Sequence, residues 1–541
     1  MAQKRSARRQ TGPAPAPAEQ PGPSALFRVC MTAALLALYA ALIAKPIDLT
    51  TSDLGRHLKN GELFFQRGLI AGTNLYSYTH PDHPFVNHHW GSGVIFYLIE
   101  SAAGFSGLSL FFIAASAAAL WLFFASAARH ASFGLAVMLT VLALPVLITR
   151  HEIRPELFSY VCSGLFWKVL SDYRERRRGA AWLTVLPFLQ LLWVNLHIYF
   201  FIGLLLISAF LLEALIALVR MNSTALGVDR RRCATLATLL CVCAGASCVN
   251  PAGLRGALYP LMILREYEFP VIENYSVPGI LAAGFQFLPL IYFLLLFAAL
   301  CLSWLYVALK DRASFFLGHL LLSSFFAATA WATIRNLALF AFFALPLTAA
   351  NLRGLSRGSM RWLGSASASA GAAAALALLL VLLQPDYFGA GRGGLGIGIK
   401  TGNLAAMQFM RRENLQGPIF NGYDLGGYLI YALFPSERVY VDNRPETYPP
   451  SFFAEDYLPL LVSEEKWRAY REMHRFNAIV INPGGRSAAM ENFAVRRMFD
   501  PDWAAVFFDK DILVLVRRFG PNQPIITRHE LPRDAVLRKV E

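Results

Sequence analysis

The sequence predicts a polytopic α-helical membrane protein with an α/β domain at its C-terminal end. Of its 541 residues, 56% are hydrophobic and only 16% are charged, whereas soluble domains carry about 25% charged residues. Apolar runs are long and repeated, as in residues 198–219, and a membrane-spanning helix needs about 20 such residues. After about residue 390 the apolar residues form short alternating or amphipathic segments, which are typical of a soluble α/β domain.

The chain begins with a basic stub and a Pro/Ala/Gly tract, residues 1–25, which predicts a disordered tail. The apolar run that follows is interpreted as a retained anchor rather than a cleaved signal peptide, because the basic region before it is long and many spans follow. Eleven spans are predicted in all. They are residues 26–45, 106–128, 132–149, 156–171, 181–195, 198–219, 233–249, 288–309, 314–333, 337–352 and 366–384.

Lysines and arginines set the predicted orientation of these spans. With the N-terminus inside, the inside segments carry 20 Lys/Arg and the outside segments before residue 385 carry nine, which is the bias expected of cytoplasmic loops. Residues 91–104 are too short to cross comfortably, and a crossing there would reverse every later loop. We therefore expect a helix in the outer interface at 91–104, with the C-terminal domain outside.

The net charge of +14 does not predict a nucleic-acid partner. After residue 384 the chain holds 20 Lys/Arg and 19 Asp/Glu, so the excess lies around the spans, where it reports orientation. No basic stripe with interleaved aromatic residues is present, and nucleic acid is therefore excluded as a partner. All seven cysteines fall inside apolar runs without CxxC spacing, so neither a disulfide framework nor a zinc-cysteine site is predicted.

The same topology places seven polar clusters at the outer ends of spans. Polar groups at such positions are costly unless they meet water, a partner or a function. Their convergence on one side therefore predicts the rim of one cavity, although helix capping or snorkelling explains any single cluster equally well. The clusters are TSDLGRHLKNG (51–61), VNHHWG (86–91), RHEIRPE (150–156), WVNLH (193–197), NPAG (250–253), ENYS (273–276) and IRN (334–336).

The C-terminal segment predicts alternating strands and helices. Strands are expected at 438–444, 476–483, 503–508 and 511–518, and helices at 404–414 and 463–476. Asp424, Asp442 and Arg444 form a charged group near one of these strands. Such a group is either a binding site for an acceptor or partner, or a salt bridge that fixes a loop.

The stretch SDLGRHL, residues 52–58, resembles the first outer loop of the GT-C glycosyltransferases, which include the protein O-mannosyltransferases and the aminoarabinose transferases. Their pattern is an Asp-Glu pair followed by an arginine. Asp53 and Arg56 match it, whereas Leu54 stands in the place of the second acid. The longer stretch 51–100, with SYT and NHHW, resembles a bacterial, largely uncharacterised branch of these membrane transferases.

The resemblance implies a GT-C-like membrane domain at 26–384 with a long first outer loop at 46–105, followed by a periplasmic α/β domain at 385–541. It also implies a bacterial inner membrane and a cytoplasmic N-terminus. The implied activity is transfer of a sugar from a polyprenyl-phosphate or polyprenyl-diphosphate carrier to a glycan, lipid or protein acceptor on the periplasmic face. Membrane lipids are then partners of the spans, no cofactor is predicted, and a divalent cation stays open.

In this interpretation Asp53 is the catalytic base, because a carboxylate usually activates the attacking hydroxyl in sugar transfer. A helix N-cap is the structural alternative. Arginines hold the leaving phosphate, and histidines bond sugar hydroxyls or phosphate, with zinc disfavoured because adjacent histidines point apart. The predicted substrate-binding residues are Arg56, His57, His88, His89, Trp90, Arg150, His151, Arg154, Glu156, Asn195, His197, Glu273, Arg335 and Asn336.

Three alternatives stay open. Arg150, Arg154 and Glu156 also fit a structural ion-pair cluster. A transporter or flippase of lipid-linked glycans is the non-enzymatic rival, although it would place functional polar groups near the bilayer midplane, where Glu213 and His319 are the main ones. A polymerase or ligase of surface polysaccharide would share the same donor and the same face.

Overall fold

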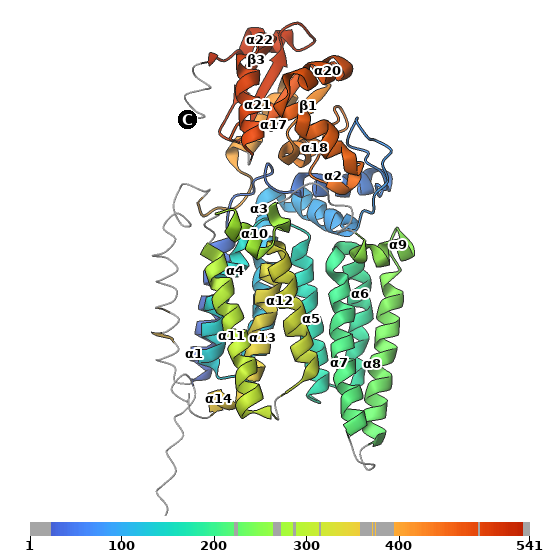
Figure 1. The fold of residues 1–541 in the computed structure, drawn as a ribbon, viewed down its shortest axis with the longest axis vertical. Helices are drawn as coiled ribbons and strands as arrows, with labels where there is room; N and C mark the ends of the chain where they lie inside the picture. Colours follow the sequence, from blue (N-terminus) through green and yellow to red (C-terminus); the bar gives the residue numbers. More distant parts are fainter. Residues whose placement is uncertain are drawn as a thin grey trace, which may run out of the picture.

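The computed structural model describes residues 23–533 apart from 221–225, 263–271, 285–287, 313–314, 358–369, 372–373, 375–393 and 485–486. In this part of the chain, a bundle of long helices carries an α/β part at one end (Figure 1). The predicted eleventh span, 366–384, lies almost wholly outside the described residues.

The other ten predicted spans each coincide with a helix. These helices are α1 (Ala25–Ile43), α3 (Trp90–His130), α4 (Phe133–Leu147), α5 (Glu156–Arg174), α6 (Val185–Leu196), α7 (Phe201–Arg220), α8 (Leu226–Ser247), α11 (Leu288–Lys310), α12 (Leu317–Ala332) and α13 (Leu337–Asn351). Six helical segments of the described chain are long and apolar enough to cross a membrane. They are Ala25–Ile43, Trp90–His130, Phe133–Arg150, Ile198–Val219, Leu288–Lys310 and Ile334–Asn351. The chain is therefore a multi-pass membrane protein, while the count of eleven crossings and the orientation stay predictions.

Short helices and turns lie between these elements. They are η1 (Ile148–Arg150), η2 (Ala180–Thr184), η3 (Ile198–Phe200), α9 (Gly253–Leu258), η4 (Tyr259–Leu261), η6 (Ile272–Asn274), α10 (Val277–Ala282), η8 (Ile334–Asn336) and α14 (Arg353–Arg357).

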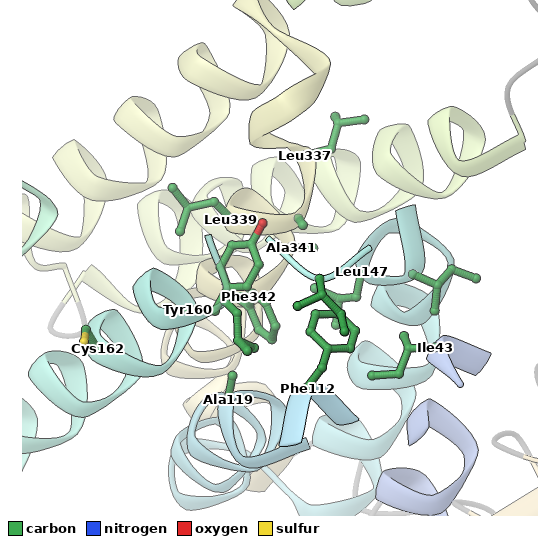
Figure 2. Packing of buried hydrophobic residues seen from close by; sticks show 14 of the residues in the cluster. Ile43, Phe112, Ala119, Leu147, Tyr160, Cys162, Leu337, Leu339, Ala341 and Phe342 are labelled. Carbon is green, nitrogen blue, oxygen red and sulfur yellow. The ribbon is translucent and has the colours of Figure 1, made fainter. Parts of the chain in front are cut away.

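The middle of the bundle is occupied by α13, which is buried along almost its whole length and packs against α3, α4, α11 and α12 (Figure 1). Figure 2 shows this packing, with the Tyr160 hydroxyphenyl ring beside Phe342 at a centroid distance of 5.1 Å. Phe343 stacks on Phe326 at 3.9 Å. Close side-chain packing of this kind holds helices together in lipid, where burial of apolar surface contributes little.

The first outer loop carries two helical segments across the end of the bundle. The helix α2 (Leu54–Arg67) lies there beside the first part of α3 (Figure 1). Within α3 the helical conformation breaks at Gly104, whose φ is 64°, a value that glycine adopts without steric cost. The break separates a segment across the bundle end from a segment within the bundle, as the sequence predicts for 91–104 and 106–128.

Two glycines allow α2 and α3 to pack closely. A Cβ atom on Gly61 would lie 2.3 Å from the Gly93 carbonyl oxygen, and one on Gly93 would lie 2.6 Å from the His57 carbonyl oxygen. Real Cβ atoms do not approach that closely. The position of His57 and its neighbours therefore depends on the absence of side chains at these two positions.

The C-terminal part contains a four-stranded sheet in the order β1-β2-β4-β3, in which β1 is parallel to β2 and the other pairs are antiparallel. Its strands are β1 (Ile419–Asn421), β2 (Ala478–Ile481), β3 (Trp503–Phe508) and β4 (Leu513–Arg517). Its helical elements are α17 (Thr401–Arg412), η11 (Tyr423–Leu425), α18 (Gly426–Leu433), η12 (Pro445–Thr447), η13 (Phe452–Tyr457), α19 (Leu458–Val462), α20 (Glu464–His474), α21 (Ala488–Phe499) and α22 (Gln523–His529).

The predicted strand at 438–444 is wrong, whereas the other three predicted strands and both predicted helices are present. Instead of joining the sheet, this segment runs against the first outer loop, where Ser77 and Val439 form an isolated bridge. The Tyr440 backbone N–H donates to the side chain of Asn421 at 2.8 Å. Side-chain and loop partners thus take the hydrogen bonds that a neighbouring strand would otherwise provide.

The C-terminal part is tied to the chain just after α1. Lys400 Nζ lies 2.8 Å from Asp48 Oδ2, and the Leu49 backbone N–H donates to Asn403 Oδ1 at 2.7 Å. These contacts fix the C-terminal part over the end of the bundle where α1 finishes.

The glycine contact between α2 and α3 gives a testable prediction. Gly61→Ala and Gly93→Ala should each destabilise the protein by about 1–3 kcal/mol, because the added methyl forces two helix backbones apart. Gly72→Ala is the control, since a Cβ there meets nothing within 4 Å. Thermal unfolding in detergent measures the difference, and equal melting temperatures for the three variants would contradict the close packing.

Candidate functional site

A cavity of about 560 Å³ lies between the end of the bundle and the C-terminal part. We call it the central cavity. Six of the seven predicted polar clusters contribute to its wall, so the predicted convergence is present. The predicted site residues on the wall are Asp53, Arg56, His57, His88, His89, Arg154, Glu156, His197, Glu273 and Arg335.

Asp53 stands at the N-cap position of α2, but its carboxylate accepts no capping hydrogen bond from the backbone N–H groups of the described helix. Its Oδ1 instead accepts a hydrogen bond from Asn443 Nδ2. Its Oδ2 lies 3.7 Å from Arg56 Nη2, and 29% of the side chain is exposed. The carboxylate is therefore oriented by neighbours and open to the cavity.

Arg56 is the buried cation of the wall with the loosest ion pairing. It is 4% exposed, and among the described residues none accepts a hydrogen bond from its Nε. Its nearest carboxylate is Asp53 at 3.7 Å, whereas Arg150 and Arg154 have carboxylate contacts of 2.6 Å. A buried guanidinium with an unused donor is costly without a ligand.

Three arginines meet one glutamate at the bundle end. Glu273 lies 3.0 Å from Arg150, 3.2 Å from Arg154 and 3.2 Å from Arg335. Burial opposes ionisation, but these guanidinium groups hold the pKa of Glu273 well below its usual range. The geometry therefore agrees with the interpretation of these residues as a cluster of ion pairs.

The cluster extends to two further glutamates. Arg150 pairs with Glu156 and Arg154 pairs with Glu152, each at 2.6 Å. Glu152 is a member that the sequence analysis did not single out.

Four histidines line the cavity close together. The ring centroids of His88 and His89 are 3.8 Å apart, and those of His57 and His197 lie 5.4 Å and 5.1 Å from His89. Burial lowers the pKa of all four, that of His88 to about 4. Arg56 Nη2 lies 3.4 Å from His57 Nε2, and because arginine only donates, that nitrogen accepts and the ring is neutral. The rings are uncharged at neutral pH and suited to bonding hydroxyls.

Some predicted ligands lie off the central cavity. Arg150 and His151 line a smaller cavity of about 100 Å³ beside it. Trp90 Nε1 donates to Asn195 Oδ1 at 2.8 Å. Asn336 Oδ1 accepts from the Tyr199 hydroxyl at 2.8 Å. The side chains of Trp90, Asn195 and Asn336 thus bond to protein groups, and their contact with a substrate stays a prediction.

The C-terminal part supplies wall residues that the sequence analysis missed. Asn443 and Glu446 both line the central cavity. Burial raises the pKa of Glu446, and in the described chain its Oε2 has no hydrogen-bond partner. The Asp442–Arg444 pair fixes this loop, with Arg444 Nη2 2.6 Å from Asp442 Oδ2. The charged residues of the segment 441–446, VDNRPE, were the sequence signal for a site. Only the fold shows that this segment lies beside Asp53.

No group of three or more His, Cys, Asp or Glu in the described residues is arranged to hold a metal ion. The rings of His57, His88 and His197 each lie beside the His89 ring, and His57 also contacts Arg56.

No protein-family model and no curated protein matches this sequence. Solved structures do match its fold. The oligosaccharyltransferase AglB from Archaeoglobus fulgidus, in complex with an inhibitory peptide and a dolichol-phosphate, is 12% identical with a TM-score of 0.55, over 90% of this chain and 74% of that one. ArnT from Cupriavidus metallidurans in the apo state is 12% identical with a TM-score of 0.50, over 91% and 98%.

This chain shares the fold of these two GT-C membrane glycosyltransferases. The match extends over both the bundle and the C-terminal part, since it covers nine-tenths of the chain. Asp53 and Arg56 lie at the end of the bundle in this fold. The resemblance drawn from SDLGRHL is thus confirmed at the level of the fold.

The histidine cluster predicts loss of stability in acid. Histidines in the unfolded chain titrate near pH 6.5, whereas the four buried histidines stay neutral to lower pH. The unfolded state therefore binds more protons, and the free energy of unfolding falls as the pH drops from about 6.5 towards 4. We expect a loss of about 2 kcal/mol between pH 7.5 and pH 5 for each histidine that stays neutral in the folded state. Thermal unfolding of wild type and His88→Gln measures it. The variant should show the shallower dependence, and identical slopes would contradict this account.

Proposed function

We propose that this protein is a membrane glycosyltransferase that takes a sugar from a polyprenyl-phosphate or polyprenyl-diphosphate carrier. The observation that carries the proposal is the pairing of Asp53 and Arg56 on one wall of the central cavity, at the end of a membrane bundle. A carboxylate and a loosely paired guanidinium are the two groups that such a transfer needs. The GT-C fold, found also in AglB with a bound dolichol-phosphate, supports the proposal.

The proposed reaction moves one sugar. The hydroxyl oxygen of the acceptor attacks the anomeric carbon as the bond from that carbon to the phosphate oxygen breaks. Asp53 takes the hydroxyl proton, and the phosphate leaves with the bonding electrons. Arg56 stabilises the negative charge that develops on the phosphate. The neutral rings of His57 and His89 bond sugar hydroxyls.

Arg56 is the first candidate for the phosphate, because its donors are the least used. Arg154 and Arg335 lie on the same wall but already pair with Glu273. The carrier tail needs an apolar path, and we infer that it enters sideways between the helices of the bundle.

The polar groups within the helices favour transfer over transport. A transporter needs its binding groups near the middle of the bundle. Glu213 and His319 contact Arg174 instead, at 3.5 Å and 2.9 Å. Arg174 is the last residue of α5, at the end of the bundle away from the C-terminal part (Figure 1). Periplasmic orientation, the inner membrane and the acceptor class belong to the same proposal.

Replacement of the proposed base tests the reaction. Asp53→Asn should lower transfer by about 10²–10⁴-fold, because the amide cannot take the proton. The measurement compares the glycome and glycoproteome of a deletion strain complemented with wild type or with the variant. Wild type should restore a glycan that Asp53→Asn does not, at equal protein level. Full restoration by Asp53→Asn would exclude the assigned role.

The phosphate site is tested by binding rather than turnover. Arg56→Ala should weaken binding of a radiolabelled polyprenyl phosphate by about tenfold to a hundredfold, since a charged hydrogen bond contributes about 1.5–3 kcal/mol. Arg67→Ala is the matched control, because Arg67 ends the same helix with an exposed side chain. Equal affinity of the two folded variants would place the phosphate elsewhere.

A further inference from the structure

We propose that Asn443 of the C-terminal part is a positioning residue for Asp53. The inference rests on the proposed function and deepens it. The C-terminal part would then complete the catalytic site, rather than only cover it or bind the acceptor. Three sets of contacts carry the proposal.

The first is the direct contact. Asn443 Nδ2 donates to Asp53 Oδ1 across 390 positions of sequence, and both residues line the central cavity. Arg56 stands on the other oxygen, with Nη2 3.7 Å from Oδ2. A carboxylate held from both sides has one orientation, which is what a base needs to meet a hydroxyl at hydrogen-bond distance.

The second is the rigidity of the loop that carries Asn443. Its neighbours Asp442 and Arg444 are fully buried and form a two-pronged ion pair, with Arg444 Nε 2.8 Å from Asp442 Oδ1 and Nη2 2.6 Å from Oδ2. Arg444 also donates to Asn74 Oδ1 at 2.9 Å, and its guanidinium lies 4.8 Å from the Phe85 ring. The loop is thus fastened to the first outer loop, the segment that also carries Asp53.

The third is the close approach of α2 and α18. A Cβ on Gly55 would lie 2.5 Å from the Gly427 carbonyl oxygen, and a Cβ on Gly426 would lie 2.3 Å from the Asp442 Cα. The Gly-Gly pair at the start of α18 therefore brings the start of α2 and the loop at 442–443 to the same place. The contact between Asn443 and Asp53 follows from backbone packing and not from one flexible side chain.

A purely structural tether would make the same hydrogen bond, so the test reads the chemical step separately from folding and from donor binding. The full-length protein in detergent is assayed for sugar transfer over a range of donor concentrations, and binding of a radiolabelled polyprenyl phosphate is measured beside it. Asn443→Ala should lower kcat by about tenfold or more with little change in the KM for the donor or in phosphate affinity, because the carboxylate loses the partner that orients it. Asn443→Gln keeps the donating amide and should retain more of the rate than Asn443→Ala.

Asn492→Ala is the matched control, since it removes the same side chain at an exposed position on α21 and should leave kcat and KM unchanged. A wild-type kcat in folded Asn443→Ala would overturn the proposal, and so would unfolding of both Asn443→Ala and Asn443→Gln, which would make Asn443 a structural residue. A wild type that transfers no sugar would remove the proposed function, whereas an active wild type with an equally active Asn443→Ala would remove only the role of Asn443.

Discussion

Charges buried at the end of a membrane bundle must be paired, and this constraint organises the rest of the structure. Glu273 is shared by Arg150, Arg154 and Arg335, and Arg150 and Arg154 also pair with Glu156 and Glu152. Removal of one partner from such a cluster leaves an uncompensated charge, which costs far more than an exposed pair. Compared with these close pairs, the contact between Asp53 and Arg56 is looser, at 3.7 Å, and it is therefore the proposed place for a charged ligand.

The bundle and the C-terminal part share this site. The first outer loop and the bundle end provide the histidines and most of the arginines, while the loop at 442–446 provides an amide on Asp53 and a further carboxyl group, Glu446. Glycines at 55, 426 and 427 let the backbones of these distant segments meet.

The sequence predicted the helices well because its apolar runs are long and repeated, six of them long enough to cross a bilayer. Six of the seven polar clusters that it predicted to converge line the central cavity. The alternation of apolar and polar residues in segment 438–444 predicts a strand. In the structure this segment forms its hydrogen bonds with Asn421 and with the first outer loop instead. The role of Asn443 could not be predicted from the sequence, because no local pattern relates it to Asp53, which lies 390 positions away. Trp90 donates to Asn195, and the contact of both residues with a substrate stays a prediction.

The most direct test of the central claim is a cryo-electron microscopy structure of the protein in lipid nanodiscs with a saturating polyprenyl phosphate. The account predicts density for the phosphate in the central cavity, within hydrogen-bond distance of the Arg56 guanidinium and beside the Asp53 carboxylate, with the tail passing between helices. A phosphate bound at the opposite end of the bundle, or a central cavity without one, would contradict it.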